Sequence, residues 1–131
     1  MIEWLKSEGA VIAIATSATE TEVKGLLRAA GVEDLIDNVA SSDDADASKP
    51  DPDIVHAALK KGGHGKDAAV MLGDTPYDIQ AAAAAGVPTI AFRSGGWPDQ
   101  DLRNALAVYD HPDDLVSHRA ESPFAAEHVV P

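Results

Sequence analysis

The sequence predicts an α/β protein: a Rossmann-like, three-layer fold with helices on both faces of a mostly parallel sheet. Three continuous apolar runs, at residues 10–15, 68–72 and 87–92, alternate with segments of helical character. Such runs are typical of strands that are buried on both faces. Strands that alternate with helices pair in parallel through right-handed crossovers, which places helices on both faces of the sheet.

The first half of the chain is predicted to form two helices and two strands before an acidic loop. In chain order these elements are a helix, a strand, a helix, a short strand and the loop: residues 2–8, 10–15, 20–30, 35–40 and 41–53. Thr19 and Glu22 have the spacing of a capping box at the start of the second helix, and Gly31 ends that helix. Its apolar face is predicted to hold Val23, Leu26, Leu27 and Ala30.

The second half repeats the alternation. The predicted elements are helix 52–61, strand 68–72, helix 76–85, strand 87–92, short helix 101–105, edge strand 107–109 and helical turn 112–116. Five consecutive alanines at 81–85 favour a helix that packs closely on the sheet. We expect one core over residues 1–116 and a weakly structured tail over 117–131.

Composition and charge limit the classes of function. The chain has 131 residues, a formal net charge of −12 and no cysteine, so it offers no disulfide framework or thiolate metal site. The acidic balance disfavours nucleic acid and anionic membranes as partners. The apolar runs are far shorter than the roughly 20 residues of a membrane span, and charged residues near the start are unlike a signal peptide. We expect a cytoplasmic protein.

The most distinctive candidate residues follow the strand at 68–72, at the end of a parallel strand where ligands bind. Asp74 directly follows this strand, and Asp78 lies about one helical turn later. Two neighbouring carboxylates repel one another, and a hard cation such as Mg²⁺ relieves that repulsion. The same two residues could instead cap the N-terminus of the next helix. The sequence leaves both interpretations open.

Two further candidates involve a hydroxyl pair and a lysine. Thr16 and Ser17 end the strand at 10–15, where hydroxyls and the N–H groups of the next helix can hold a phosphate oxygen. The alternative is that these hydroxyls only cap that helix. Lys49 lies in the acidic loop, where it could neutralise a carboxylate and a phosphate, or be an ordinary surface lysine.

In their order and spacing these features resemble the haloacid dehalogenase-like (HAD) hydrolase superfamily. The runs VIAIATSA, SKPDPDI and VMLGDTPYDIQAAAAAG are similar to its second, third and fourth motifs, and VPTIAFRSGG is similar to the strand and loop that follow. The resemblance covers about residues 10–115 and is closest to the phosphoglycolate phosphatase and β-phosphoglucomutase-like branch.

The resemblance implies Mg²⁺-dependent phosphotransfer from a small phosphorylated metabolite through a phospho-aspartate. By similarity, Thr16 and Ser17 bind the phosphoryl group, and Lys49 steadies the charge of the nucleophile and the phosphate. Thr16 and Lys49 are thus the expected catalytic residues. Asp74 is expected to ligate Mg²⁺, and Asp78 to do so directly or through water.

The first motif of the family has no counterpart in the sequence. That motif is an apolar strand that ends in Asp-x-Asp and supplies the nucleophile and the general acid/base. Asp-x-Asp strings occur at 44–46, 51–53 and 99–101, but none follows a buried strand. The cap between the first and second motifs is missing too, so the chain resembles the C-terminal part of a hydrolase core.

In the family the first strand lies between the strands predicted here at 10–15 and 68–72, so its absence implies two open sheet edges. An upstream segment in trans, a swapped subunit of a homodimer or a rearranged pairing could fill that slot. We expect little turnover from this chain alone. The alternative is a non-catalytic phosphate- or metal-binding or subunit-interaction module derived from the hydrolase. A receiver-like signalling domain also uses acids, Thr and Lys, but in a different order.

Overall fold

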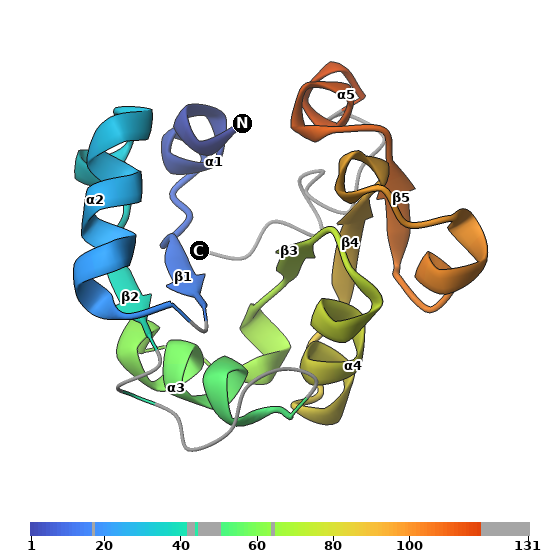
Figure 1. Cartoon of the computed structure of the whole chain (residues 1–131), viewed down its shortest axis with the longest axis horizontal. Helices are drawn as coiled ribbons and strands as arrows, with labels where there is room; N and C mark the ends of the chain where they lie inside the picture. Colours follow the sequence, from blue (N-terminus) through green and yellow to red (C-terminus); the bar gives the residue numbers. More distant parts are fainter. Residues whose placement is uncertain (17, 42–43, 45–50, 64, 119–131) are drawn as a thin grey trace.

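The computed structural model describes residues 1–16, 18–41, 44, 51–63 and 65–118, and its strands form two parallel sheets (Figure 1). The first sheet pairs β1 (Ala13–Ala15) with β2 (Asn38–Ala40). The second has the order β3 (Met71–Gly73), β4 (Thr89–Phe92) and β5 (Ala107–Tyr109). The α/β class is therefore confirmed, and the described strands are divided between two sheets.

Five of the six predicted helical segments are α-helices in the described residues, with most of their ends where local signals put them. They are α1 (Ile2–Ser7), α2 (Glu20–Ala30), α3 (Asp53–Gly62), α4 (Pro76–Ala84) and α5 (Pro112–Ser117). The Thr19 hydroxyl accepts a hydrogen bond from the Glu22 N–H, and Gly31 ends α2 in the left-handed conformation. Short 3₁₀ turns at Glu33–Leu35, Lys66–Ala68, Arg93–Gly95 and Asp99–Leu102 complete the described elements.

Helices cover both faces of the strands. On one face, α3 and α4 pack through a cluster that includes Ile54, Val55, Ala81 and Ala82. On the other face, α1 and α5 contribute to a cluster around Ile90, Phe92 and Leu115. Ala81 and Ala82 are fully buried, so their small side chains let α4 approach β3 and β4 closely, as the alanine run predicted.

Several expectations were wrong in detail. Leu26 is 67% exposed and Val23 is the buried residue of α2, because α2 packs mainly on the turn Glu33–Leu35 rather than on a broad sheet. The short helix expected at 101–105 is a 3₁₀ turn at Asp99–Leu102. Both β1 and β3 begin three residues later than their apolar runs. Residues 119–131 of the predicted tail lie outside the described part of the chain. No helix among the described residues has the length and hydropathy to span a membrane.

Candidate functional site

The turn between β3 and α4 is built by reciprocal hydrogen bonds around Asp78. The Asp78 N–H donates to Thr75 Oγ1 at 3.1 Å, and Asp78 Oδ2 accepts from the N–H groups of Asp74 at 3.1 Å and Thr75 at 3.2 Å. This is a capping box, with Pro76 in the first turn of α4. Asp78 is buried, and its carboxylate fixes the backbone that carries Asp74.

Gly73 allows this close approach of Asp78 to the end of β3. A Cβ at position 73 would lie 2.6 Å from both Cβ and Oδ2 of Asp78, well inside ordinary contact distance. Any larger side chain would therefore displace the carboxylate that caps α4. The glycine is required here by space rather than by a positive φ angle.

Asp74 is held differently from Asp78, since its side chain is exposed. Within the described residues, the Asp74 carboxylate has no hydrogen-bond or ion-pair partner, and it lies at the end of β3, on the wall of a groove of about 520 Å³. The loop after β4 packs directly against it, because a Cβ on Gly95 would lie 2.5 Å from the Asp74 carbonyl oxygen and 2.8 Å from its Cβ. The backbone of Asp74 is therefore fixed while its carboxylate is available.

Thr16 directly follows β1, whose last residue, Ala15, lines the same groove on the side opposite Asp74. The Thr16 N–H donates to the Ala40 carbonyl at 3.0 Å, and its Oγ1 accepts from the Ala18 N–H at 3.2 Å. The hydroxyl thus stabilises the turn before α2. Ser17 and Lys49 lie outside the described residues. Their predicted roles, and those of Thr16, Asp74 and Asp78 as site residues, stay predictions.

The residues present fit a Mg²⁺ ion held at Asp74. Mg²⁺ usually keeps several waters and binds through one or two carboxylates together with substrate phosphate. Among the described residues, no side chain or backbone group competes for the exposed Asp74 carboxylate, whereas Asp78 Oδ2 already accepts hydrogen bonds from two backbone N–H groups. The described part of the chain contains no group of three or more His, Asp or Glu side chains that could hold a metal ion. The remaining ligands would be water and phosphate.

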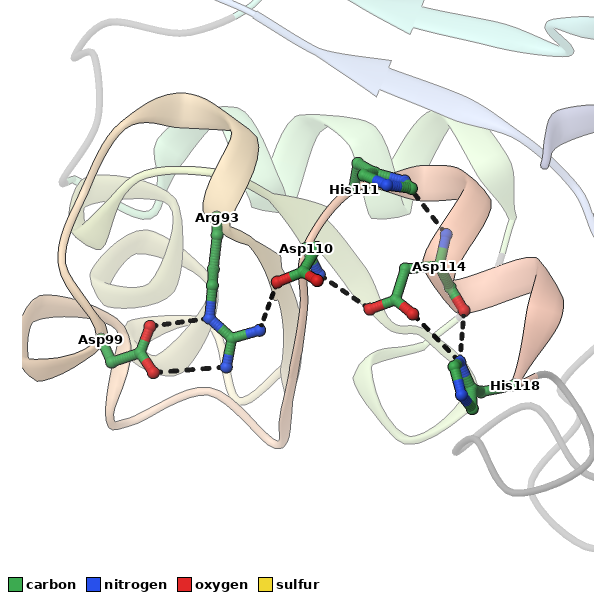
Figure 2. Close-up of polar contacts among 6 residues, drawn as sticks. All are labelled: Arg93, Asp99, Asp110, His111, Asp114 and His118. Carbon is green, nitrogen blue, oxygen red and sulfur yellow. Dashed lines mark hydrogen bonds and ion pairs between the residues drawn. The ribbon is translucent and has the colours of Figure 1, made fainter.

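An ion-pair network, not anticipated from the sequence, anchors the loop that packs on Asp74 (Figure 2). Arg93, which begins the 3₁₀ turn at Arg93–Gly95, donates from Nε and Nη2 to the Asp99 carboxylate at 2.8 and 3.2 Å, and from Nη1 to Asp110 Oδ1 at 2.8 Å. The hydrogen bonds that Arg93 donates to the Asp99 and Asp110 carboxylates raise the pKa of Arg93, and the hydrogen bond from Arg93 lowers the pKa of Asp99. The Asp110 N–H also donates to Asp114 Oδ2 at 2.9 Å, which continues the network into α5.

The aromatic residues beside this turn form a second contact. The rings of Tyr77 and Trp97 meet edge to face, with centroids 5.7 Å apart and an interplanar angle of 89°. Trp97 also packs against the buried cluster of Ile79, Ala91 and Leu102. It therefore anchors the loop after β4 to α4, and Tyr77 remains 47% exposed.

Comparison with known sequences identifies relatives over most of the chain. The family model described as haloacid dehalogenase-like hydrolase matches residues 1–92. A phosphoglycolate phosphatase of Rhodospirillum rubrum is 35% identical over 108 residues, covering 81% of this chain and 44% of that protein. A putative pyrophosphatase PpaX of Caldanaerobacter subterraneus is 35% identical over 105 residues, covering 80% and 48%. The chain thus spans about half the length of the curated relatives it matches.

Solved structures of similar fold include further hydrolases. A hydrolase from Pseudomonas syringae superposes with a TM-score of 0.83 and 34% identity, over 92% of this chain and 57% of that one. CbbY from Rhodobacter sphaeroides, solved in complex with phosphate, gives a TM-score of 0.79 and 28% identity, over 87% and 52%. A putative β-phosphoglucomutase from Thermotoga maritima, at 24% identity and a TM-score of 0.82, shares the fold.

Proposed function

Because the chain belongs to the haloacid dehalogenase-like hydrolases, in the phosphoglycolate phosphatase and β-phosphoglucomutase-like branch, we propose that it forms the metal- and phosphate-binding part of a phosphatase for a small phosphate ester. The observation that carries this proposal is the exposed Asp74 carboxylate at the end of β3. Its backbone is fixed by the Asp78 cap on one side and by Gly95 on the other.

Each predicted residue has a defined task in this proposal. Asp74 holds Mg²⁺. Asp78 keeps the backbone of Asp74 in place and contacts the metal either directly or through a water molecule. Thr16 and Ser17 bind the phosphoryl oxygens, and Lys49 balances the negative charge beside them. When bound, Mg²⁺ supplies electrostatic stabilisation of the charge that develops on the transferring phosphoryl group.

The nucleophilic aspartate, we propose, comes from a segment outside these 131 residues. In each of the three Asp-x-Asp strings, one described aspartate already has a structural partner. Asp44 Oδ2 accepts from the Ser41 N–H and pairs with Lys61, both at 2.9 Å. The Asp99 carboxylate binds Arg93, and Asp51 Oδ1 accepts from an α3 N–H. Little turnover is therefore expected from the chain alone.

Metal binding tests the first part of this proposal. Titration calorimetry with Mg²⁺ should show binding to the wild-type chain and its loss in Asp74→Asn. The control is Asp67→Asn, which removes the same charge from an exposed position in the turn Lys66–Ala68. Equal Mg²⁺ binding in Asp74→Asn and wild type would remove Asp74 from the site.

Turnover tests the second part. Hydrolysis of p-nitrophenyl phosphate with Mg²⁺ should be negligible for the chain alone and should appear when a relative's N-terminal segment is supplied in trans. Mg²⁺ binding without turnover in any combination would instead support a non-catalytic metal- or phosphate-binding module. A homodimer as the source of the missing strand, and a cytoplasmic location, stay predictions.

A further inference from the structure

The groove beside Asp74 has a second polar side chain at the same end, that of Ser94. All the other side chains that line this groove are apolar. Asp74 directly follows β3, and Ser94 lies two residues after the end of β4. Since β3 and β4 are parallel neighbours in one sheet, their carboxyl ends lie side by side, where ligands bind in sheets of this kind.

The alternation of side chains along the strands puts Asp74 and Ser94 on one face of the sheet. Leu72 and Phe92 both contribute to the cluster around Leu115, on the face that α5 covers. Side chains along a strand alternate between the two faces with a period of two. Asp74 and Ser94 each lie two positions beyond these apolar residues, so both belong to that face, in agreement with their shared place in the lining of the groove.

The turn that carries Ser94 packs directly on the side chain of Asp74. A Cβ on Gly95, the next residue, would lie 2.8 Å from both Cβ and Cγ of Asp74, so the Gly95 backbone touches the base of the carboxylate. The ion pairs of Arg93 hold the other end of the same short turn. The backbone of Ser94 is therefore fixed, from both sides, beside the proposed metal ligand.

The hydroxyl of Ser94 has no structural task among the described residues. Ser94 is exposed, and its Oγ makes no hydrogen bond in the described part of the chain. By contrast, the hydroxyls of Thr16 and Thr75 accept backbone N–H groups and so stabilise turns. An available hydroxyl thus lies at the same groove end as the available Asp74 carboxylate. A few polar groups that converge at one end of an apolar groove are typical of a site that orients a ligand.

We propose that Ser94 is a positioning residue for the cation at Asp74: its Oγ accepts a hydrogen bond from a water molecule bound to that cation. This inference rests on the proposed function, since it takes Asp74 as the Mg²⁺ ligand. Mg²⁺ keeps several of its waters in a near-octahedral shell, whereas Ca²⁺ takes more ligands in a flexible one. Partners outside the direct ligands tune metal affinity. A fixed hydroxyl that orients one water therefore favours Mg²⁺ over Ca²⁺.

Titrations of the chain with Mg²⁺ and with Ca²⁺ test the proposal without measuring activity. Ser94→Ala should lower the affinity for Mg²⁺ by about three- to tenfold, the effect of one ordinary hydrogen bond, and the affinity for Ca²⁺ by less. Ser94→Thr keeps the hydroxyl and should retain Mg²⁺ binding. The control is Ser117→Ala, which removes an exposed hydroxyl at the end of α5 and should leave both affinities unchanged. The urea midpoints of all these variants, measured without metal, should match that of the wild type.

Paramagnetic Mn²⁺ shows where the cation binds. Mn²⁺ prefers the same carboxylate and water ligands as Mg²⁺ and broadens the NMR signals of nearby amides. In the wild type, broadening should be strongest at Asp74, Ser94 and Gly95, and it should be lost in Asp74→Asn. In Ser94→Ala the same amides should broaden, but only at higher Mn²⁺ concentration. This readout separates the place of binding from its strength.

Three results would overturn the proposal. The first is Mg²⁺ binding that is lost in Asp74→Asn but unchanged in Ser94→Ala, which would leave the proposed function intact. The second is an equal loss of Mg²⁺ and Ca²⁺ affinity in Ser94→Ala together with a lower urea midpoint, which would mean that Ser94 only shapes the turn. The third is the absence of Mg²⁺ binding to the wild type, which would remove the proposed function as well.

Discussion

Replacing Gly73 with alanine should destabilise the chain, because the added methyl group collides with the Asp78 carboxylate. The new Cβ would lie 2.6 Å from Asp78 Oδ2, and ordinary contact begins at 3.4 Å, so the carboxylate must move by about 0.8 Å. Its two hydrogen bonds, now 3.1 and 3.2 Å long, would then exceed hydrogen-bond distance.

The expected loss can be estimated from these contacts. The two hydrogen bonds to the charged Asp78 carboxylate contribute about 1.5–3 kcal/mol each, or about 3–6 kcal/mol together. Alanine recovers about 0.4–1 kcal/mol by restricting the unfolded chain. A net loss of about 2–5.6 kcal/mol follows, which is a large share of the 5–15 kcal/mol that typically stabilises a domain.

Urea unfolding followed by circular dichroism measures this loss. The control is Gly25→Ala in α2, where a Cβ meets no atom within 4 Å and the helix should gain about 0.5–1 kcal/mol. Asp78→Asn, which keeps an oxygen acceptor, should lose less stability than Asp78→Ala. A change of less than about 0.5 kcal/mol in Gly73→Ala would refute the role assigned to the Asp78 cap.

Three other changes test the rest of the structure. Hydrogen bonds from Lys6 and from a backbone N–H lower the pKa of Asp37. The stability that Asp37 contributes should therefore be complete above its ordinary pKa of 3.8 and lost as the pH falls below that value. The melting temperatures of wild type and Asp37→Asn should converge in acid. Arg93→Met should cost at most about 1 kcal/mol, because its ion pairs are exposed, and the cost should shrink in high salt during urea unfolding. Ala82→Leu should cost about 1–3 kcal/mol by overpacking, whereas Ala83→Leu on the exposed face of α4 should be nearly neutral in the same assay.

Local signals were sufficient to predict the helices. Thr19 and Gly31 define the ends of α2, and Pro76 marks the first turn of α4. The capping role of Asp78 was one of two alternatives that the sequence left open. The spacing from Thr75 to Asp78, a hydroxyl followed three residues later by a carboxylate, is the signal that could have decided in favour of the cap.

Features that depend on distant residues could not be predicted in the same way. Arg93 binds Asp110, 17 positions later, and no local pattern announces that contact. The late starts of β1 and β3 depend on what pairs with their open edges, because apolar character favours a strand without supplying its neighbour. The burial of Leu26 was mispredicted because periodicity identifies an apolar face but not the size of the surface that covers it.

The position of Arg93 makes buffer composition a variable in any measurement at Asp74. Arg93 and Gly95 belong to the same short turn, so the ion pairs of Arg93 and the contact of Gly95 with Asp74 depend on the same backbone segment. Dissolved salt weakens the ion pairs of Arg93, since Asp99 and Asp110 are exposed. The affinity of the chain for Mg²⁺ should therefore fall between dilute and concentrated buffer by more than screening of the acidic surface explains. This additional loss of affinity should be absent when Arg93 is replaced by an uncharged residue.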